Sequence, residues 1–261
     1  MGKQRLQKVF KNPKKNILSI YLSAGYPQLD AMTKLIPLLA DKGVDFIEAG
    51  MPYSDPLADG PTIQKSSSIA LKNGMNLQTY FEQIKQVRSQ VDLPIIFMGY
   101  FNQVLKTGIT KFLDLCVSSG IDGLILPDIT PEIYEAQYKS IFESYDLAMI
   151  FLVSPTTSPE RIKKIDALTS GFVYIVSSSS TTGKEGVFGP EQIAYFKRIQ
   201  AMNLHNPEVI GFGIDRREKF QLANQYANGA IIGSAFIKAI ENPERYLKEA
   251  ESFIRTIKKP L

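Results

Sequence analysis

The chain has 261 residues, of which 44% are hydrophobic and 21% charged, a composition that is typical of a globular protein and excludes a disordered or fibrous one. One cysteine and one histidine exclude an internal disulfide and a zinc site built from a Cys/His cluster. The net charge of +4 suits an anionic small molecule but is too small for a nucleic-acid-binding surface. No apolar run approaches the roughly 18 residues that a membrane span needs, so we expect a cytoplasmic protein without a membrane anchor.

The first element in chain order is a basic stretch with Leu6, Val9 and Phe10 on one side, which predicts an amphipathic N-terminal helix. After it, short apolar runs alternate with segments of helical periodicity. Eight runs predict strands, at 17–23, 45–49, 95–98, 123–126, 148–153, 172–176, 209–211 and 230–232. Helices are predicted at 31–42, in a broken stretch at 62–90, and at 111–119, 133–144, 160–168, 191–202, 217–227 and 243–258.

Apolar strands that alternate with helices indicate a parallel sheet covered on its outside by the helices. Right-handed crossovers then allow either an open doubly wound sheet or a closed barrel. Eight units in about 250 residues favour the barrel, and no linker-like segment divides the chain. We therefore expect one α/β domain over residues 1–261, a (β/α)8 TIM barrel with an extra N-terminal helix.

Catalytic groups in such a barrel lie at the ends of the strands and in the loops that follow them. Glu48 interrupts an apolar strand, and strand alternation is consistent with a side chain that points into the barrel mouth. Near the rings of Tyr21 and Tyr174 its carboxyl group should have a raised pKa, as a general acid or base working near neutral pH requires. The alternative is a structural acid bonded to backbone or tyrosine hydroxyls, and the sequence leaves both open.

Two further acids lie in the loop after the predicted second strand. Asp55 or Asp59 could approach a ligand from the rim, in an environment different from that of Glu48 and therefore with a different role. Asp before Pro or Gly is also common turn chemistry, which is the alternative for both.

Glycines near the end of the chain predict a phosphate site. Gly211-Phe212-Gly213 and the stretch from Gly229 to Ser234 each join an apolar strand to a helix, where backbone N–H groups can hold an anion. Barrel enzymes often bind phosphate with the loops after strands seven and eight. Each glycine pattern is a weak signal alone, but together at the last two strands they are more specific.

The remaining reactive side chains do not form a site. His205 lies in a turn and is expected at the surface, and Cys116 falls on the apolar side of a helix. Without a histidine in a motif with a serine, a hydrolytic triad has no base. The predicted strands carry no lysine for a Schiff base, and the nearest, Lys184, lies in a long hydroxyl-rich loop.

The stretch at 46–64, FIEAGMPYSDPLADGPTIQ, resembles the signature of the tryptophan synthase alpha subunits. The resemblance extends to YLSAGYP at 21–27, GYFN at 99–102, PD at 127–128, SPTT at 154–157, GFVY at 171–174, TG at 182–183, GFGI at 211–214 and GAIIGS at 229–234. It implies a TIM-barrel carbon–carbon lyase that cleaves indole-3-glycerol phosphate to indole and glyceraldehyde 3-phosphate. It also implies no metal or cofactor in this chain, and a beta subunit that carries pyridoxal phosphate and receives the indole through a tunnel in an α2β2 heterotetramer.

The resemblance assigns the catalytic roles to Glu48 and Asp59. Glu48 would protonate C3 of the indole ring and later accept a proton from the C3′ hydroxyl, while Asp59 would accept the indole N–H. Substrate binding is assigned to Tyr21, Tyr174, Thr182, Gly183, Gly213, Gly233 and Ser234, of which Gly183, Gly213, Gly233 and Ser234 would hold the phosphate. The loops after strands two and six would close as lids, and Pro52 and Asp55 would face the beta subunit.

Two places depart from the family pattern. Ser180-Thr181 stands where Gly-Val is usual, and Thr130 where Asp-x-Pro is common, so lid closure and subunit coupling do not follow from the resemblance. Three alternatives stay open: a phosphosugar isomerase or aldolase, a regulatory subunit that only activates a partner, and a stand-alone enzyme that releases indole. The lack of a Schiff-base lysine or metal cluster disfavours the first, and the retained pair of acids disfavours the second.

Overall fold

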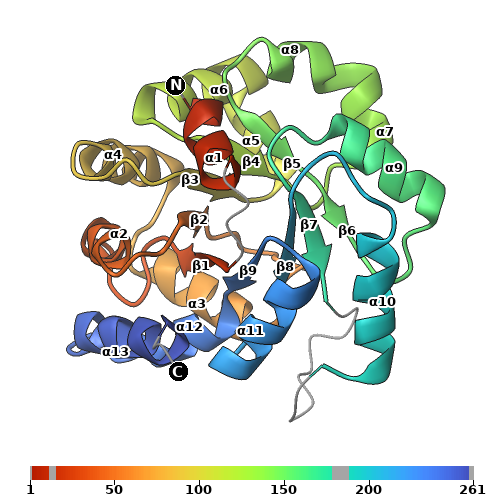
Figure 1. Ribbon diagram of the computed structural model, residues 1–261. Helices are drawn as coiled ribbons and strands as arrows, with labels where there is room; N and C mark the ends of the chain where they lie inside the picture. The colour runs from red at the N-terminus through yellow and green to blue at the C-terminus, as the bar shows by residue number, and fades with distance from the viewer. Residues whose placement is uncertain (1, 12–15, 178–187, 259–261) are drawn as a thin grey trace.

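A computed structural model describes residues 2–11, 16–177 and 188–258, and Figure 1 shows a ring of strands surrounded by helices. The strands are β1 Ile17–Ser23, β2 Phe46–Gly50, β3 Ile95–Met98, β4 Gly123–Ile125, β5 Ala148–Ile150, β6 Leu152–Val153, β7 Val173–Val176, β8 Glu208–Gly211 and β9 Gly229–Ile232. All pairs are parallel, in the order β5-β4-β3-β2-β1-β9-β8-β7-β6. The predicted α/β barrel is confirmed, whereas the assignment of all of 1–261 to one domain stays a prediction.

The ninth strand arises from a break, not from an added unit. The predicted strand at 148–153 is divided at Phe151 into β5, which pairs with β4, and β6, which pairs with β7. The Phe151 carbonyl still accepts a hydrogen bond from the Tyr174 amide, at 3.0 Å, so the ring continues across the break. The eight predicted strands therefore correspond to the eight units of the barrel.

The helices lie around the ring, except for α1, which lies across one end of it (Figure 1). They are α1 Gly2–Phe10, α2 Ala31–Asp41, α3 Pro61–Lys72, α4 Leu77–Arg88, α5 Phe101–Thr107, α6 Ile109–Ser119, α7 Pro131–Ile133, the π-helical turn η1 Tyr134–Tyr138, α8 Lys139–Glu143, α9 Pro159–Leu168, α10 Pro190–Gln200, α11 Arg217–Tyr226, α12 Ser234–Ala239 and α13 Tyr246–Lys258. The broken stretch at 62–90 is two helices, separated where Gly74 has φ +94°, and the side chain of Asn76 caps the second. Short helices α5 and α12 were not predicted.

The predicted N-terminal helix is present as α1, and it closes one end of the barrel, a position that the sequence did not predict. Leu6 is fully buried, and the ring of Phe10 lies 6.3 Å from Phe46 and 6.0 Å from Phe172, between centroids. Phe46 begins β2, so this aromatic cluster lies at the N-terminal end of the strands. The opposite end, where the strands terminate, is left for the site.

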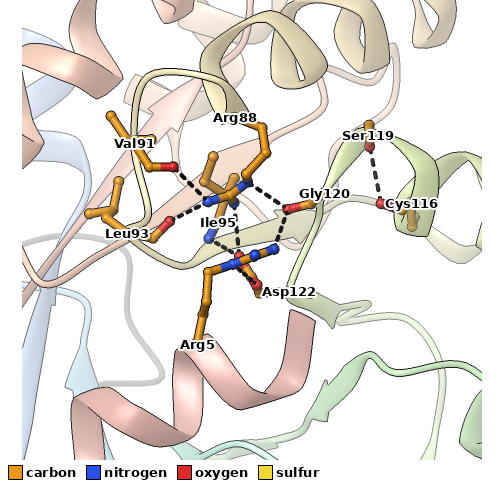
Figure 2. A network of polar contacts seen from close by, with 9 residues as sticks. All are labelled: Arg5, Arg88, Val91, Leu93, Ile95, Cys116, Ser119, Gly120 and Asp122. Atoms are coloured by element: carbon orange, nitrogen blue, oxygen red, sulfur yellow. Dashed lines mark hydrogen bonds and ion pairs between the residues drawn. The ribbon is translucent and has the colours of Figure 1, made fainter. Parts of the chain in front are cut away.

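A buried ionic network attaches α1 to that closed end (Figure 2). Asp122, just before β4, accepts hydrogen bonds from Arg5 at 2.7 Å, from Arg88 at 2.9 Å and from the Ile95 amide at 2.8 Å. Burial raises the pKa of Asp122 to about 6, although the two arginines and the amide favour its charged form. Helices α1 and α4 are thereby tied to the same carboxylate.

Candidate active site

Glu48 is placed by β2, in register with Tyr21 of β1. Its side chain is 1% exposed, and no described residue hydrogen-bonds to either carboxylate oxygen. Burial raises its pKa to about 8, so that it carries a proton at neutral pH. A buried carboxyl group without a polar partner is expensive, which argues against the structural alternative that it is bonded to neighbouring groups.

Tyr21 and Tyr174 are buried and lie close enough to both acids for their charges to act on the phenols. Burial raises the pKa of both phenols, and the charges of Glu48 and Asp59 raise it further, so both acids act on the same two rings. Two glycines make room for these rings: a Cβ at Gly50 would overlap the Tyr21 ring, and one at Gly211 would overlap the Tyr174 ring. Gly211 is therefore required by the tyrosine, independently of any phosphate.

Asp59 reaches the site from the loop between β2 and α3. The hydroxyl of Tyr100 donates to its Oδ2 at 3.0 Å and accepts the Ala58 amide, also at 3.0 Å. Burial raises the pKa of Asp59, and the bond from Tyr100 opposes this rise. Tyr100 stacks on Tyr53, with 4.9 Å between the ring centroids, which fixes the hydroxyl toward the loop. Sequence reasoning missed this role, although GYFN was among the motifs that pointed to the family.

A cavity at the ends of β1, β2 and β3 brings Asp59 and Tyr21 together. Its lining comprises Tyr21, Met51, Asp59, Ser67, Met98, Gly99, Tyr100 and Pro127. Glu48 does not line this cavity and is linked to it through Tyr21, its neighbour in register. Glu48, buried on the strand, and Asp59, on the loop, therefore occupy different environments near Tyr21, an arrangement that can separate acid and base roles.

The two glycine-rich loops follow neighbouring strands. Gly213 comes after β8, Gly233 follows β9 and Ser234 begins α12, with β8 and β9 paired. A Cβ at Gly233 would lie 3.5 Å from Cβ of Tyr21, which places this loop beside the same ring. The first N–H groups of α12 have no acceptors within the helix, as at every helix start. Thr182 and Gly183, and with them Ser180-Thr181 and Lys184, lie outside the described residues.

The residues predicted to face a partner differ in exposure. Pro52 is buried, and its carbonyl accepts a hydrogen bond from Gln103 of α5, whereas Asp55 is exposed and bonded to Ser54. Leu57, two residues on, is 90% exposed. Thr130, a departure from the family pattern, caps α7 by accepting the Ile133 amide.

His205 is exposed and Cys116 fully buried, as expected. Within residues 2–11, 16–177 and 188–258, no three His, Cys, Asp or Glu side chains gather as a metal site would need. Over the same residues, no helix has the length and apolar character to cross a membrane.

Comparison with known proteins bears on the identity of this barrel. Residues 7–260 match the family described as Tryptophan synthase alpha chain. The tryptophan synthase alpha chain of Christiangramia forsetii is 51% identical over 93% of this chain and 94% of its own length, and that of Flavobacterium psychrophilum is 54% identical over 86% and 88%. The alpha subunit structure from Legionella pneumophila superposes with a TM-score of 0.86 at 31% identity, covering 98% of this chain and 97% of that one. A chain of tryptophan synthase from M. tuberculosis gives 0.84 at 30% identity, over 97% and 96%. The chain therefore belongs to the tryptophan synthase alpha chain family, the lyases that cleave indole-3-glycerol phosphate.

Proposed function

We propose that Glu48 and Asp59 are the two catalytic acids with which this chain cleaves indole-3-glycerol phosphate in a retro-aldol reaction. The observation that carries the proposal is the buried Glu48 carboxyl group, whose pKa is raised to about 8 and which no described residue hydrogen-bonds. Such a group holds a proton at neutral pH and can release it to a substrate. Asp59, whose hydrogen bond from Tyr100 favours its charged form, supplies the negative partner.

In the first step, protonated Glu48 gives its proton to C3 of the indole ring, and the ring becomes cationic. Asp59 accepts a hydrogen bond from the indole N–H and stabilises this positive charge. The bond between C3 and C3′ then breaks, and its electron pair returns to the ring. The C3′ hydroxyl gives its proton to Glu48 as the aldehyde forms. Glu48 donates one proton and receives one, so the acid is regenerated and the reaction needs no metal or cofactor.

The phosphate of the substrate is assigned to the N–H groups of Gly213, Gly233 and Ser234. Gly183 is proposed to contribute as well, and Thr182 to hold Asp59 when the loops close. Tyr21 and Tyr174 would form the walls beside the indole ring. Support comes from the position of the two glycine loops after paired strands β8 and β9, the place where barrel enzymes commonly bind phosphate.

Members of this family pair with a beta subunit, and we extend that pairing to this chain. The proposed partner holds pyridoxal phosphate, receives the indole through a tunnel and forms an α2β2 heterotetramer. Exposed Asp55 and Leu57 are available for this contact, whereas Pro52 would act by shaping the loop from beneath. As in other amino-acid biosynthesis, the cytoplasm is the proposed location.

Indole formation from indole-3-glycerol phosphate tests the proposal. The purified chain is assayed alone and with a tryptophan synthase beta chain, and we expect a slow reaction that the partner accelerates. Full activity without acceleration would point to the stand-alone indole-releasing alternative. Absence of indole under both conditions would overturn the proposed function.

A further inference from the structure

The loop after β8 is held by side chains at two successive carbonyl groups. The buried hydroxyl of Ser177 donates to the Phe212 carbonyl at 2.6 Å. The ammonium group of Lys219, from α11, donates to the Gly213 carbonyl at 3.0 Å. Two side chains, one from the residue after β7 and one from α11, therefore fix consecutive peptide groups of the loop that carries Gly213.

Fixing a carbonyl also fixes the amide of the same peptide group. In a trans peptide the C=O and N–H bonds point in opposite directions, so the Gly213 and Ile214 N–H groups face away from Ser177 and Lys219. Among the described residues, none accepts a hydrogen bond from either N–H. Phe212 and Gly213 have φ of +67° and +70°, a left-handed backbone that a phenylalanine rarely adopts unless its surroundings hold it there. Consecutive N–H groups in such a turn form an anion-binding concavity.

Lys219 is an unusual residue for its place in α11. It is 5% exposed and lies in the first turn, where a cation is opposed by the helix dipole and buried at a cost. Its carboxylate partner is Asp215, at 3.0 Å, which also bonds to Arg216. Burial disfavours the charged Asp215, yet bonds from Arg216 and Lys219 outweigh this and lower its pKa. The helix dipole does not explain a buried lysine here, whereas its bonds to Asp215 and to the Gly213 carbonyl do, and the second of these bonds reaches the loop after β8.

We propose that Lys219 is a positioning residue for the substrate phosphate. Its ammonium group holds the Gly213 carbonyl so that the Gly213 and Ile214 N–H groups meet the phosphate, and Ser177 anchors the preceding peptide in the same way. This inference rests on the proposed function, since it takes the β8–α11 loop as the phosphate site. Neither residue touches the indole ring or the reacting carbon atoms in this scheme.

The test compares Lys219→Met with Lys219→Arg in the full chain. Measured quantities are kcat and KM for indole-3-glycerol phosphate, and the Kd values of inorganic phosphate and of indole as separate probes. We expect Lys219→Met to raise KM and the phosphate Kd roughly 10-fold, as loss of a charge-assisted hydrogen bond implies, with kcat changed less than about 3-fold and the indole Kd unchanged. Lys219→Arg should restore most of the affinity.

Lys164→Met is the matched control, because Lys164 also pairs with a carboxylate, Glu135 at 2.8 Å, but on the surface of α9. It should leave all four quantities unchanged. An unchanged phosphate Kd in Lys219→Met, or an equal loss of indole affinity, would overturn the inference. If Lys219→Met does not fold, Ser177→Ala decides: a higher KM at unchanged indole Kd supports the inference, and an unchanged KM overturns it. A wild-type chain that releases no indole would instead remove the proposed function.

Discussion

Glu48 and Asp122 are both buried carboxyl groups in this barrel, one in the middle of β2 and one just before β4, and their surroundings differ. Asp122, at the closed end, accepts hydrogen bonds from two arginines and a backbone amide. Glu48, in the middle of β2, receives no hydrogen bond from any described residue. Burial raises both pKa values, to about 6 for Asp122 and about 8 for Glu48. At neutral pH the first is therefore charged and joins helices, and the second holds a proton that chemistry can use.

The largest expected effect is on the reaction and comes from Glu48→Gln. The amide keeps the size of the side chain but can neither give nor take the proton, so kcat should fall by roughly 10³- to 10⁴-fold while substrate still binds. Single-turnover indole release measures the loss. Glu208→Gln is the control, because burial also raises the pKa of Glu208, to about 7, but it begins β8 at the closed end. Turnover retained by Glu48→Gln would contradict its catalytic role.

For Asp122, the second of the two carboxyl groups, replacement by alanine should reduce stability without changing the reaction. Removing the carboxylate leaves Arg5 and Arg88 without their shared partner, which costs about 3–5 kcal/mol in comparable buried networks. Urea unfolding measures this, and kcat per folded molecule should not change. Glu132→Ala breaks an exposed ion pair with Arg161 and should cost less than about 1 kcal/mol. A similarly small loss for Asp122→Ala would mean that the network does not hold α1.

The pH dependence of stability sharpens the contrast. Glu48 keeps its proton in the folded chain up to about pH 8, whereas in the unfolded chain it loses the proton near its ordinary pKa of 4.5. The folded state binds more protons in this window, so the free energy of unfolding falls as pH rises from about 4.5 to 8. Glu48→Gln lacks this term, and its stability relative to wild type should grow by a few kcal/mol toward pH 8. Urea unfolding of both proteins between pH 4.5 and 8 measures this change. If Glu48 were already ionised in the folded chain, the difference in the free energy of unfolding between Glu48→Gln and wild type would stay constant.

The apolar composition of the strands is the reason that the sequence predicted both the barrel and Glu48 as a candidate site residue. Short apolar runs predict buried strands, and a carboxylate inside such a run is an exception that indicates a special role. Helices α5 and α12 were missed because seven and six residues are too few to show a helical period. The break at Phe151 lies inside one continuous apolar run, so nothing in the composition marks it.

Contacts between distant segments were beyond sequence reasoning. Asp122 meets Arg5 and Arg88 across separations of 117 and 34 residues, and local patterns carry no information about such pairs. The burial of Lys219 could not be predicted either, since a lysine in a helix is expected at the surface. The loop residues Thr182 and Gly183 remain predictions from the family resemblance.

The smallest expected effect concerns Asp59, the acid in the loop after β2. Tyr100→Phe removes the hydroxyl that donates to Asp59, and with it the interaction that opposes the raised pKa of that carboxyl. Asp59 would then be protonated over a wider range, so kcat/KM should fall a few-fold, about the effect of one hydrogen bond, most strongly at low pH. The acid limb of the pH–activity profile should therefore move to higher pH. Tyr53→Phe, in the ring stacked on Tyr100, lacks contact with Asp59 and should leave the profile in place. Equal profiles for the two variants would show that the charge on Asp59 is not set by Tyr100.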